Sequence, residues 1–181
     1  QILTNRHARM RSVIGGGGFA GLVEDAMAES PEIHANLGGW PLPNVWLGVS
    51  VEDQRWADIR IPALLDTPAA VRFLSCEPLL GPVDLGEFAE CGECMGSGQV
   101  GDRDMACGPC RGSGNLLGWI IAGGESGSGF RPLDPGWARS LRDQAVASGV
   151  PFFFKQWGGR TPKAGGRLLD GRTWDQMPKV G

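Results

Sequence analysis

Several features that would point to a membrane protein or to histidine chemistry are missing from the sequence. It has no run of about eighteen apolar residues, the length that a membrane-spanning helix needs, so we expect no membrane span. No signal peptide is visible, and we therefore expect a cytoplasmic protein. Tyrosine is absent, and the two histidines, His7 and His34, lie far in sequence from other candidate ligands. We interpret both as loop or surface residues, so histidine-based catalysis is not indicated.

Short motifs for phosphate binding and nucleophilic catalysis are also missing. The glycine-rich segment Gly123–Gly129 lacks the Gly-Lys-Ser/Thr ending of a P-loop and does not match the G-x-G-x-x-G fingerprint. Its serine, Ser126, is one glycine short of the spacing of a nucleophile elbow. Glycines still allow a backbone to approach a ligand closely. The segment therefore indicates either a flexible turn or a phosphate or nucleotide cradle.

Length and charge set the class of the protein. The chain has 181 residues, which is enough for one domain with a buried core. Its net charge of −3 indicates that the surface as a whole is not built to bind nucleic acid. The stretch 155–179 is basic, however, and we interpret it either as a phosphate-binding segment or as a solvated chain end. Its charged residues are the cations Lys155, Arg160, Lys163, Arg167, Arg172 and Lys179 and the anions Asp170 and Asp175.

Short apolar runs, most of them rich in β-branched or aromatic residues, predict β-strands. They are residues 2–4, 45–51, 71–76, 119–122 and 151–154. Helical spacing lies between them, at 19–27, at Pro62–Leu65, and after Asp134, which we predict to be an N-cap with Pro135 at the first helical position. We interpret the glycine run 15–18 as a linker.

The alternation of strands and helices predicts an α/β fold with parallel strands joined by right-handed crossovers. The five runs cannot close an eight-stranded barrel. Two architectures stay open: a small open sheet, or the later part of a (β/α) barrel that begins upstream of Gln1. We assign residues 1–85 and 118–157 to this partial barrel and residues 158–181 to a basic C-terminal tail, which is a loop or a cap over the barrel mouth.

Polar residues follow the predicted strands. Because ligands bind at the carboxyl ends of parallel strands, we expect the charged residues at these ends to meet in one pocket. They are Glu52, Glu77, Glu125 and Lys155. Converging carboxylates can transfer protons or hold a cation, and a lysine among them can hold a phosphate or carboxylate. Groups that could bind or orient a ligand beside them are Ser50, Gly123, Gly124, Ser126 and Gln156. The alternative is ordinary loop charge.

Four of the five cysteines have the spacing of a metal site. The pairs Cys91-Gly-Glu-Cys94 and Cys107-Gly-Pro-Cys110 are separated by twelve residues, and each continues into a Gly-x-Gly tail. This spacing favours a structural zinc site with four thiolates and no open position for catalysis. Two disulfides, a thioredoxin-like redox pair and an iron–sulfur site are the alternatives. We interpret the fifth cysteine, Cys76, as a small buried side chain.

The cysteine pairs resemble the Cys-x-x-Cys-x-Gly-x-Gly repeats of DnaJ-type chaperones over residues 91–114. This resemblance implies a zinc-binding hairpin and not chaperone activity, and we predict a zinc-knuckle insert at 86–117. The insert is acidic, which argues against a DNA-binding finger. Its charged residues are Glu87, Glu90, Glu93, Asp102 and Asp104 against Arg103 and Arg111.

Longer segments of the chain resemble one protein family. They are residues 3–6, 44–54, 73–82, 123–127 and 151–158. They are similar to the phage and prophage family called gp thirty-seven/gp sixty-eight, or the three-Cys-motif family, over most of residues 1–178. The resemblance implies the C-terminal part of a barrel of radical S-adenosylmethionine type. S-adenosylmethionine and a [4Fe–4S] cluster would then require an N-terminal cysteine motif, which this chain lacks. Gly123-Gly124-Glu125 is similar to an element that holds the methionine amino group in such enzymes, but it comes late in the chain.

These observations support two hypotheses of function. In the first, the chain is the C-terminal part of a radical-SAM-like enzyme that acts on a nucleotide or nucleic acid, with the residues at the strand ends lining its pocket. In the second, the chain is a zinc-stabilised module that binds a partner protein and catalyses nothing.

Overall fold

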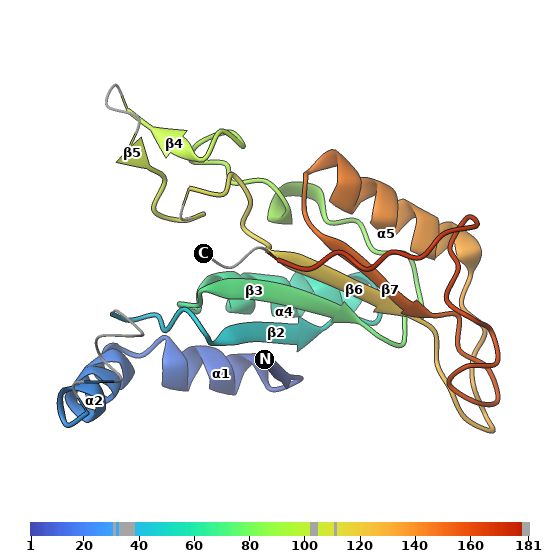
Figure 1. Cartoon of the computed structure of the whole chain (residues 1–181), viewed down its shortest axis with the longest axis horizontal. Helices are drawn as coiled ribbons and strands as arrows, with labels where there is room; N and C mark the ends of the chain where they lie inside the picture. The colour runs from blue at the N-terminus through green and yellow to red at the C-terminus, as the bar shows by residue number, and fades with distance from the viewer. Residues whose placement is uncertain (31, 33–38, 102–104, 111, 179–181) are drawn as a thin grey trace.

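The centre of the molecule is a five-stranded parallel sheet. A computed structural model describes residues 1–30, 32, 39–101, 105–110 and 112–178. The spatial order of the strands, β1-β2-β3-β6-β7, follows their order along the chain (Figure 1). The strands are β1 (Ile2–Thr4), β2 (Trp46–Ser50), β3 (Val71–Cys76), β6 (Trp119–Gly123) and β7 (Phe152–Gln156). The prediction of parallel strands in these five runs is confirmed, with small shifts at their ends.

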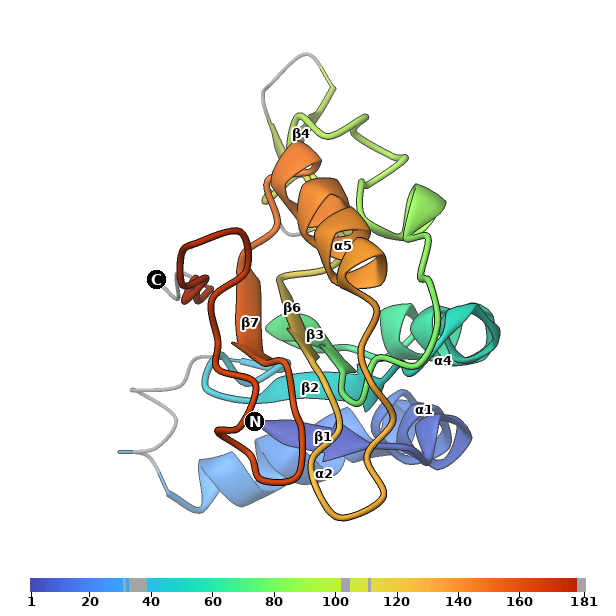
Figure 2. The ribbon, with the colours of Figure 1, turned by 90° about the vertical axis from the view of Figure 1, so that its right-hand side faces the viewer.

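Helices cover one side of this sheet. The described α-helices are α1 (His7–Ile14), α2 (Gly17–Ala28), α4 (Gln54–Leu65) and α5 (Pro135–Ala147), with a 3₁₀ helix at Gly86–Phe88. Figure 2 shows α1, α4 and α5 on the same side of the strands. Unbroken strand order with crossover helices on one side is the progression from which (β/α) barrels are built. The described strands form an open sheet, and no barrel closes among them.

The helix α4 begins earlier than the sequence analysis predicts. The side chain of Asp53 accepts a hydrogen bond from the N–H of Trp56, which caps the first turn and starts the helix at Gln54. The predicted helix start at Pro62 is wrong, because Pro62 lies inside α4. An aspartate cap therefore decides the helix start.

The ends of the other helices follow simple local rules. The N–H of Gly136 donates to the side chain of Asp134, and Pro135 opens α5, as the sequence predicts. The glycine run 15–18 is not a linker. Gly15 ends α1, and α2 already begins at Gly17.

The core lies between the sheet and the helices. Alternate residues of β2, β3, β6 and β7 point into it, because successive side chains in a strand face opposite sides. The strands contribute Leu47, Val49, Val51, Leu74, Cys76, Ile120, Ala122, Phe152 and Phe154, and the helices contribute Met10, Ala57, Ile61, Leu64, Ala138, Leu141 and Ala145. Burial of one such Leu, Ile or Phe side chain stabilises a fold by about 1.5–3 kcal/mol.

The other face of the sheet carries an aromatic cluster. The ring of Trp119 lies 6.0 Å, between centroids, from each of the rings of Trp46, Phe73 and Phe153. Gly48 makes room for this cluster, because a Cβ at that position would lie 2.4 Å from the ring of Phe73. Phe73 and Trp119 are almost fully buried, so the middle strands are covered on both faces.

The segment after β7 packs along the outer edge of that strand. The N–H of Phe154 donates to the carbonyl of Trp174, and the N–H of Gln176 donates to the carbonyl of Phe152. Leu169 and Trp174 are buried. The later part of the predicted basic tail, residues 169–176, is therefore folded against the sheet.

The connection from β3 to β6 contains a small antiparallel hairpin of β4 (Gln99–Val100) and β5 (Met105–Ala106). In Figure 1 this hairpin projects beyond the amino ends of the strands, at the end of the sheet opposite their carboxyl ends. Residues that begin strands, such as Val71, share a cavity of about 390 Å³ with Cys110 of the insert. The insert therefore sits at the amino end of the sheet.

No helix among the described residues is long and apolar enough to cross a membrane. His7 begins α1 and is half-buried. His34 and Lys179 lie outside the described residues, as do the predicted charges of the insert at positions 102–104 and 111.

Replacing Gly48 by alanine should destabilise the protein by about 1–3 kcal/mol, because the added methyl group overpacks the aromatic cluster. Urea unfolding measures this change. The control is Gly21→Ala, inside α2, where a Cβ meets nothing within 4 Å. The control should be neutral or stabilising by up to about 1 kcal/mol, since alanine favours helix. Equal unfolding midpoints for Gly48→Ala and the wild type would contradict the packing described here.

Candidate functional site

The carboxyl ends of the five strands lie along one edge of the sheet, because all neighbouring strands run in parallel. Figure 2 views the molecule from this end. Each strand-end residue singled out in the sequence lies at this edge. The contacts among them differ, however, and they separate one pair from the rest.

Glu77 and Lys155 form the central pair. Glu77 directly follows β3, and Lys155 lies near the end of β7. The Nζ of Lys155 lies 3.3 Å from Oε1 and 3.4 Å from Oε2 of Glu77. The Glu77 side chain is 17% exposed, whereas that of Lys155 is 56% exposed. Burial raises the pKa of Glu77 above its ordinary value, and the nearby ammonium of Lys155 opposes this rise. A carboxyl group with a raised pKa beside a cation is suited to proton transfer.

Glycines of β6 and of the loop after it create the space for this pair. A Cβ at Gly123 would lie 2.5 Å from Oε1 of Glu77, so the carboxylate of Glu77 lies directly over this glycine. A Cβ at Gly124 would lie 1.9 Å from the carbonyl oxygen of Trp157. The N–H of Gly124 donates to the carbonyl of Gln156. Both predicted glycines therefore permit close approach, one to a side chain and one to the next backbone.

A second polar contact lies beside the central pair. The side-chain amide of Gln156 donates to Oγ of Ser126 over 2.8 Å, and to the carbonyl of Gly124 over 3.4 Å. These residues come from the ends of two neighbouring strands. They form a half-buried group of donors and acceptors that could orient a ligand.

Glu125 is occupied by an arginine. The guanidinium of Arg131 donates to both carboxylate oxygens over 2.8 Å, and the backbone N–H of Arg131 donates to one of them as well. These hydrogen bonds lower the pKa of Glu125 to about 2. Its carboxylate is therefore always ionised near neutral pH and its oxygens already have donors, which leaves little capacity to hold an amino group.

The carboxylate of Glu52 is also bound by an arginine. The Nη1 of Arg60, from α4, lies 2.9 Å and 3.2 Å from the two oxygens of Glu52 and 2.7 Å from the carbonyl oxygen of Ser50. Arg60 is buried and stacks over Trp56 at 3.9 Å. Ser50 is itself buried. This cluster fixes the end of β2 to α4, which is a structural task.

Cys76 lies in the core beneath this edge. Burial raises the pKa of its thiol, and the carboxylates of Glu77 and Glu52 raise it further. The thiol is therefore neutral and is not available as a nucleophile or metal ligand. This agrees with its interpretation as a small buried side chain.

The sequence analysis did not identify the arginines that separate these carboxylates. Arg131 follows Glu125 by six residues through a loop, and no local pattern marks that contact. Arg60 follows Glu52 by eight residues, and the contact could be found only once α4 was known to begin at Gln54.

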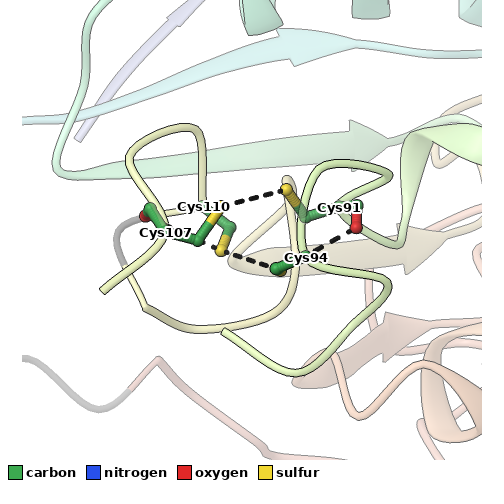
Figure 3. Close-up of side chains that lie close together, drawn as sticks. All are labelled: Cys91, Cys94, Cys107 and Cys110. Carbon is green, nitrogen blue, oxygen red and sulfur yellow. Dashed lines mark hydrogen bonds between the residues drawn. The ribbon is translucent and has the colours of Figure 1, made fainter. Parts of the chain in front are cut away.

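A metal centre can form at the opposite end of the sheet. The sulfur atoms of Cys91, Cys94, Cys107 and Cys110 all lie within 4.8 Å of one another, and Figure 3 shows the four side chains gathered between two loops. The closest pairs are Cys91 with Cys107, at 3.7 Å, and Cys94 with Cys110, at 3.6 Å. A tetrahedral ion with Zn–S bonds of about 2.3 Å separates its sulfurs by about 3.8 Å.

This spacing bears on two of the alternatives for the cysteines, the disulfides and a multi-iron cluster. The separations far exceed the S–S bond of about 2.05 Å in a disulfide, and all five cysteines are free. A multi-iron cluster would hold its thiolates farther apart, because metal and sulfide ions lie between them. The arrangement therefore fits one metal ion with four sulfur ligands.

The two halves of the centre have matching geometry. Each half turns through two glycines with positive φ, Gly96 and Gly98 in one and Gly112 and Gly114 in the other. A Cβ at Gly98 would lie 2.2 Å from the carbonyl oxygen of Gly112, and a Cβ at Gly114 would lie 2.2 Å from that of Gly96. The glycine tails therefore wrap closely against each other, which explains the repeated Gly-x-Gly in the sequence.

Backbone N–H groups prepare the sulfurs for a metal. The N–H of Gly98 donates to Sγ of Cys94 over 3.2 Å, and that of Gly114 donates to Sγ of Cys110 over 3.3 Å. Burial raises the pKa of Cys107 to about 12. Burial also acts on Cys110, but the hydrogen bond from Gly114 and others outweigh it and lower its pKa to about 7. The centre thus favours at least one thiolate, the form that binds metal.

A [4Fe–4S] cluster of the radical S-adenosylmethionine type does not fit the cysteines of this chain. Four of the five face one another in the insert, and the fifth, Cys76, is buried in the core. None of the five lies exposed at the carboxyl edge. Ligands for such a cluster would have to come from outside these 181 residues.

The opposite pKa shifts of Glu77 and Glu125 predict opposite effects of pH on stability. The folded state holds the proton of Glu77 more tightly than the unfolded state does, so this residue's contribution to stability is lost as pH rises through the raised pKa. Glu125 has a lowered pKa, so its contribution is lost as pH falls toward about 2.

Urea unfolding between about pH 3 and about pH 7 tests both signs. The stability of the wild type relative to Glu77→Gln should decrease as pH rises, whereas its stability relative to Glu125→Gln should increase. Two slopes of the same sign would contradict the assigned environments.

Comparison with known proteins places the chain in a family. A sequence profile described as a protein of unknown function, DUF5131, matches residues 1–178. No curated protein and no solved structure matches the chain. The profile match spans the sheet, the cysteine insert and the segment after β7, and the chain therefore belongs to the DUF5131 family.

Proposed function

We propose that the chain is part of a (β/α)-barrel enzyme that transfers a proton on a nucleotide or nucleic-acid substrate at its carboxyl edge. Glu77 is the group that moves the proton, and Lys155 holds its carboxylate and faces the anionic part of the substrate. Gln156 and Ser126 orient the substrate beside them. Carboxyl edges of parallel α/β folds are where such sites occur.

The observation that carries this proposal is the Glu77–Lys155 pair. Glu52 and Glu125 are each bound by an arginine that reaches both carboxylate oxygens. The ion-pair partner of Glu77 is instead a lysine, Lys155, whose side chain is half exposed. An arginine fork fixes a carboxylate, but a lysine can exchange it for another anion. Among these three acids, Glu77 is therefore the one that can change partner during a reaction.

We also propose that the protein is related to radical S-adenosylmethionine enzymes of the phage gp thirty-seven/gp sixty-eight type. The unbroken strand order supports this relation, and so does the resemblance of the strand-end segments. S-adenosylmethionine and its cluster would be held by residues outside this chain, and they would supply radical chemistry. The proton transfer at Glu77 does not depend on them.

For the metal centre we propose structural zinc. Four thiolates around one ion, without an open position, are typical of zinc sites that hold a fold together. Free thiols that serve as ligands also fit a reducing compartment such as the cytoplasm. Zinc would fix the insert against the amino ends of the strands.

Metal analysis of the purified protein should find about one zinc ion per chain. Cys94→Ser should lose most of this zinc and unfold the insert, while the parallel sheet keeps its circular dichroism signal. Cys76→Ala is the control, because it removes a cysteine that is not a ligand, and it should keep its zinc. Equal zinc contents of Cys94→Ser and Cys76→Ala would overturn the assignment of the four cysteines as zinc ligands. A coloured protein that contains iron would show that the metal is iron and not zinc.

Thermal shift assays with a panel of nucleosides and nucleotides test the proposed function. At least one compound should stabilise the wild type, and Glu77→Gln and Lys155→Met should each reduce its affinity about tenfold or more. Glu24→Gln makes the same chemical change at an exposed position on α2 and should bind like the wild type. If no compound binds, or if Glu77→Gln binds all of them as the wild type does, the proposal fails.

The insert supports a second candidate, a protein-binding module. Met95 and Met105 are 84% and 58% exposed, and they lie in an acidic segment that projects from the sheet. Exposed methionines adapt well to partner surfaces. In this case Cys94→Ser would abolish binding of the partner protein, and Glu77→Gln would leave this binding intact.

A further inference from the structure

We infer that the substrate is a single nucleotide with a chain of phosphates, held by Arg160 and Lys163, and not a nucleic-acid strand. This inference rests on the proposed function, because it concerns the same site. The cations at this edge that are free to bind phosphate distinguish a single nucleotide from a nucleic-acid strand.

The basic stretch after β7 loses some of its cations to partners of its own. Arg167 pairs with Asp175 and lies 5.4 Å from the centroid of the Phe153 ring. Arg172 lies 3.5 Å over the ring of Trp174. These two arginines hold the segment against the sheet.

Two cations of the stretch remain exposed. Among the described residues, Arg160 and Lys163 have neither an acidic partner nor a ring beneath them, and both side chains are open to solvent. No aspartate or glutamate occurs between Lys155 and Asp170 in the sequence. The field in this part of the edge is therefore positive, although the whole protein carries a net charge of −3.

Backbone hydrogen bonds join the loop that carries these cations to the loop that carries Ser126. The loop after β7 is closed by hydrogen bonds from the N–H of Trp157 to the carbonyl of Gly166 and from the N–H of Gly166 to that of Lys163. It is joined to the loop after β6, because the N–H of Gly127 donates to the carbonyl of Gly159 and the N–H of Gly159 donates to that of Glu125. Figure 1 shows both loops beyond the carboxyl ends of the strands, and Figure 2 shows them side by side. We call them the two-loop lobe, residues 124–131 and 157–168.

The number of cations fits a short phosphate chain. The lobe and the strand end together offer Lys155, Arg160 and Lys163, which can hold two or three phosphate groups by charge-assisted hydrogen bonds. A protein that makes about 6–10 phosphate contacts to a nucleic-acid strand uses more cations than these three. The remaining arginine of the lobe, Arg131, is committed to Glu125. The two-loop lobe and the end of β7 therefore offer cations for a nucleoside diphosphate or triphosphate, and fewer than a long phosphate backbone would use.

Calorimetric titration of the full chain with nucleosides and their mono-, di- and triphosphates tests this inference. Affinity should rise about tenfold with each of the first two phosphates, and Arg160→Gln and Lys163→Gln should each reduce triphosphate affinity about tenfold. Nucleoside affinity should not change in either variant. Arg9→Gln, which removes an exposed positive charge from α1, is the matched control and should bind triphosphate like the wild type.

A single-stranded oligonucleotide of about 20 nucleotides completes the test. It should bind no more tightly than the triphosphate. If the oligonucleotide bound more tightly than the triphosphate, and if Arg9→Gln weakened this binding, the inference would be overturned in favour of a nucleic acid. Nucleoside binding that depends on Glu77 but is indifferent to phosphate number, Arg160 and Lys163 would also overturn it, while leaving the proposed function standing.

Discussion

Parallel pairing of strands in chain order is the constraint on which the rest of this structure depends. After each strand the chain must return to the amino end of the sheet before the next strand begins. The crossovers therefore run along the helix side, and all the strands end at the same edge. The strand order β1-β2-β3-β6-β7 contains no reversal, which places polar residues from successive strand ends side by side. Lys155 of β7 meets Glu77, which precedes it by 78 residues, across the glycine end of β6 that lies between their strands.

The two ends of the sheet have different tasks. The amino end holds the cysteine insert, and just after the insert the N–H of Gly118 donates to the carbonyl of Arg72. The carboxyl end holds the charged pairs. In (β/α) barrels this division separates stability from chemistry, and the insert here is consistent with a stabilising element at the amino end. A metal ion in the insert would thus act on the start of β6 and not on the charged pairs.

Charge pairing then distinguishes residues that look equivalent in sequence. Glu52, Glu77 and Glu125 all follow strands, but an arginine reaches both carboxylate oxygens of Glu52 and of Glu125 and holds each side chain in place. Glu77 lies over Gly123 in a partly buried position with only Lys155 beside it. Burial favours its neutral form, whereas the lysine favours its charged form.

The sequence by itself determined the features that depend on local pattern. Apolar runs indicated all five strands, Asp134 and Pro135 marked the start of α5, and the spacing of Cys91, Cys94, Cys107 and Cys110 indicated a site for one metal ion. These features follow from side-chain periodicity, capping and chain length, which act over a few residues. Only the tertiary structure decided that Arg60 binds Glu52, that Arg131 binds Glu125 and that the carboxylate of Glu77 needs a glycine at position 123. Those contacts depend on the lateral packing of strands, helices and loops, and the distance between two such side chains cannot be read from their separation in the sequence.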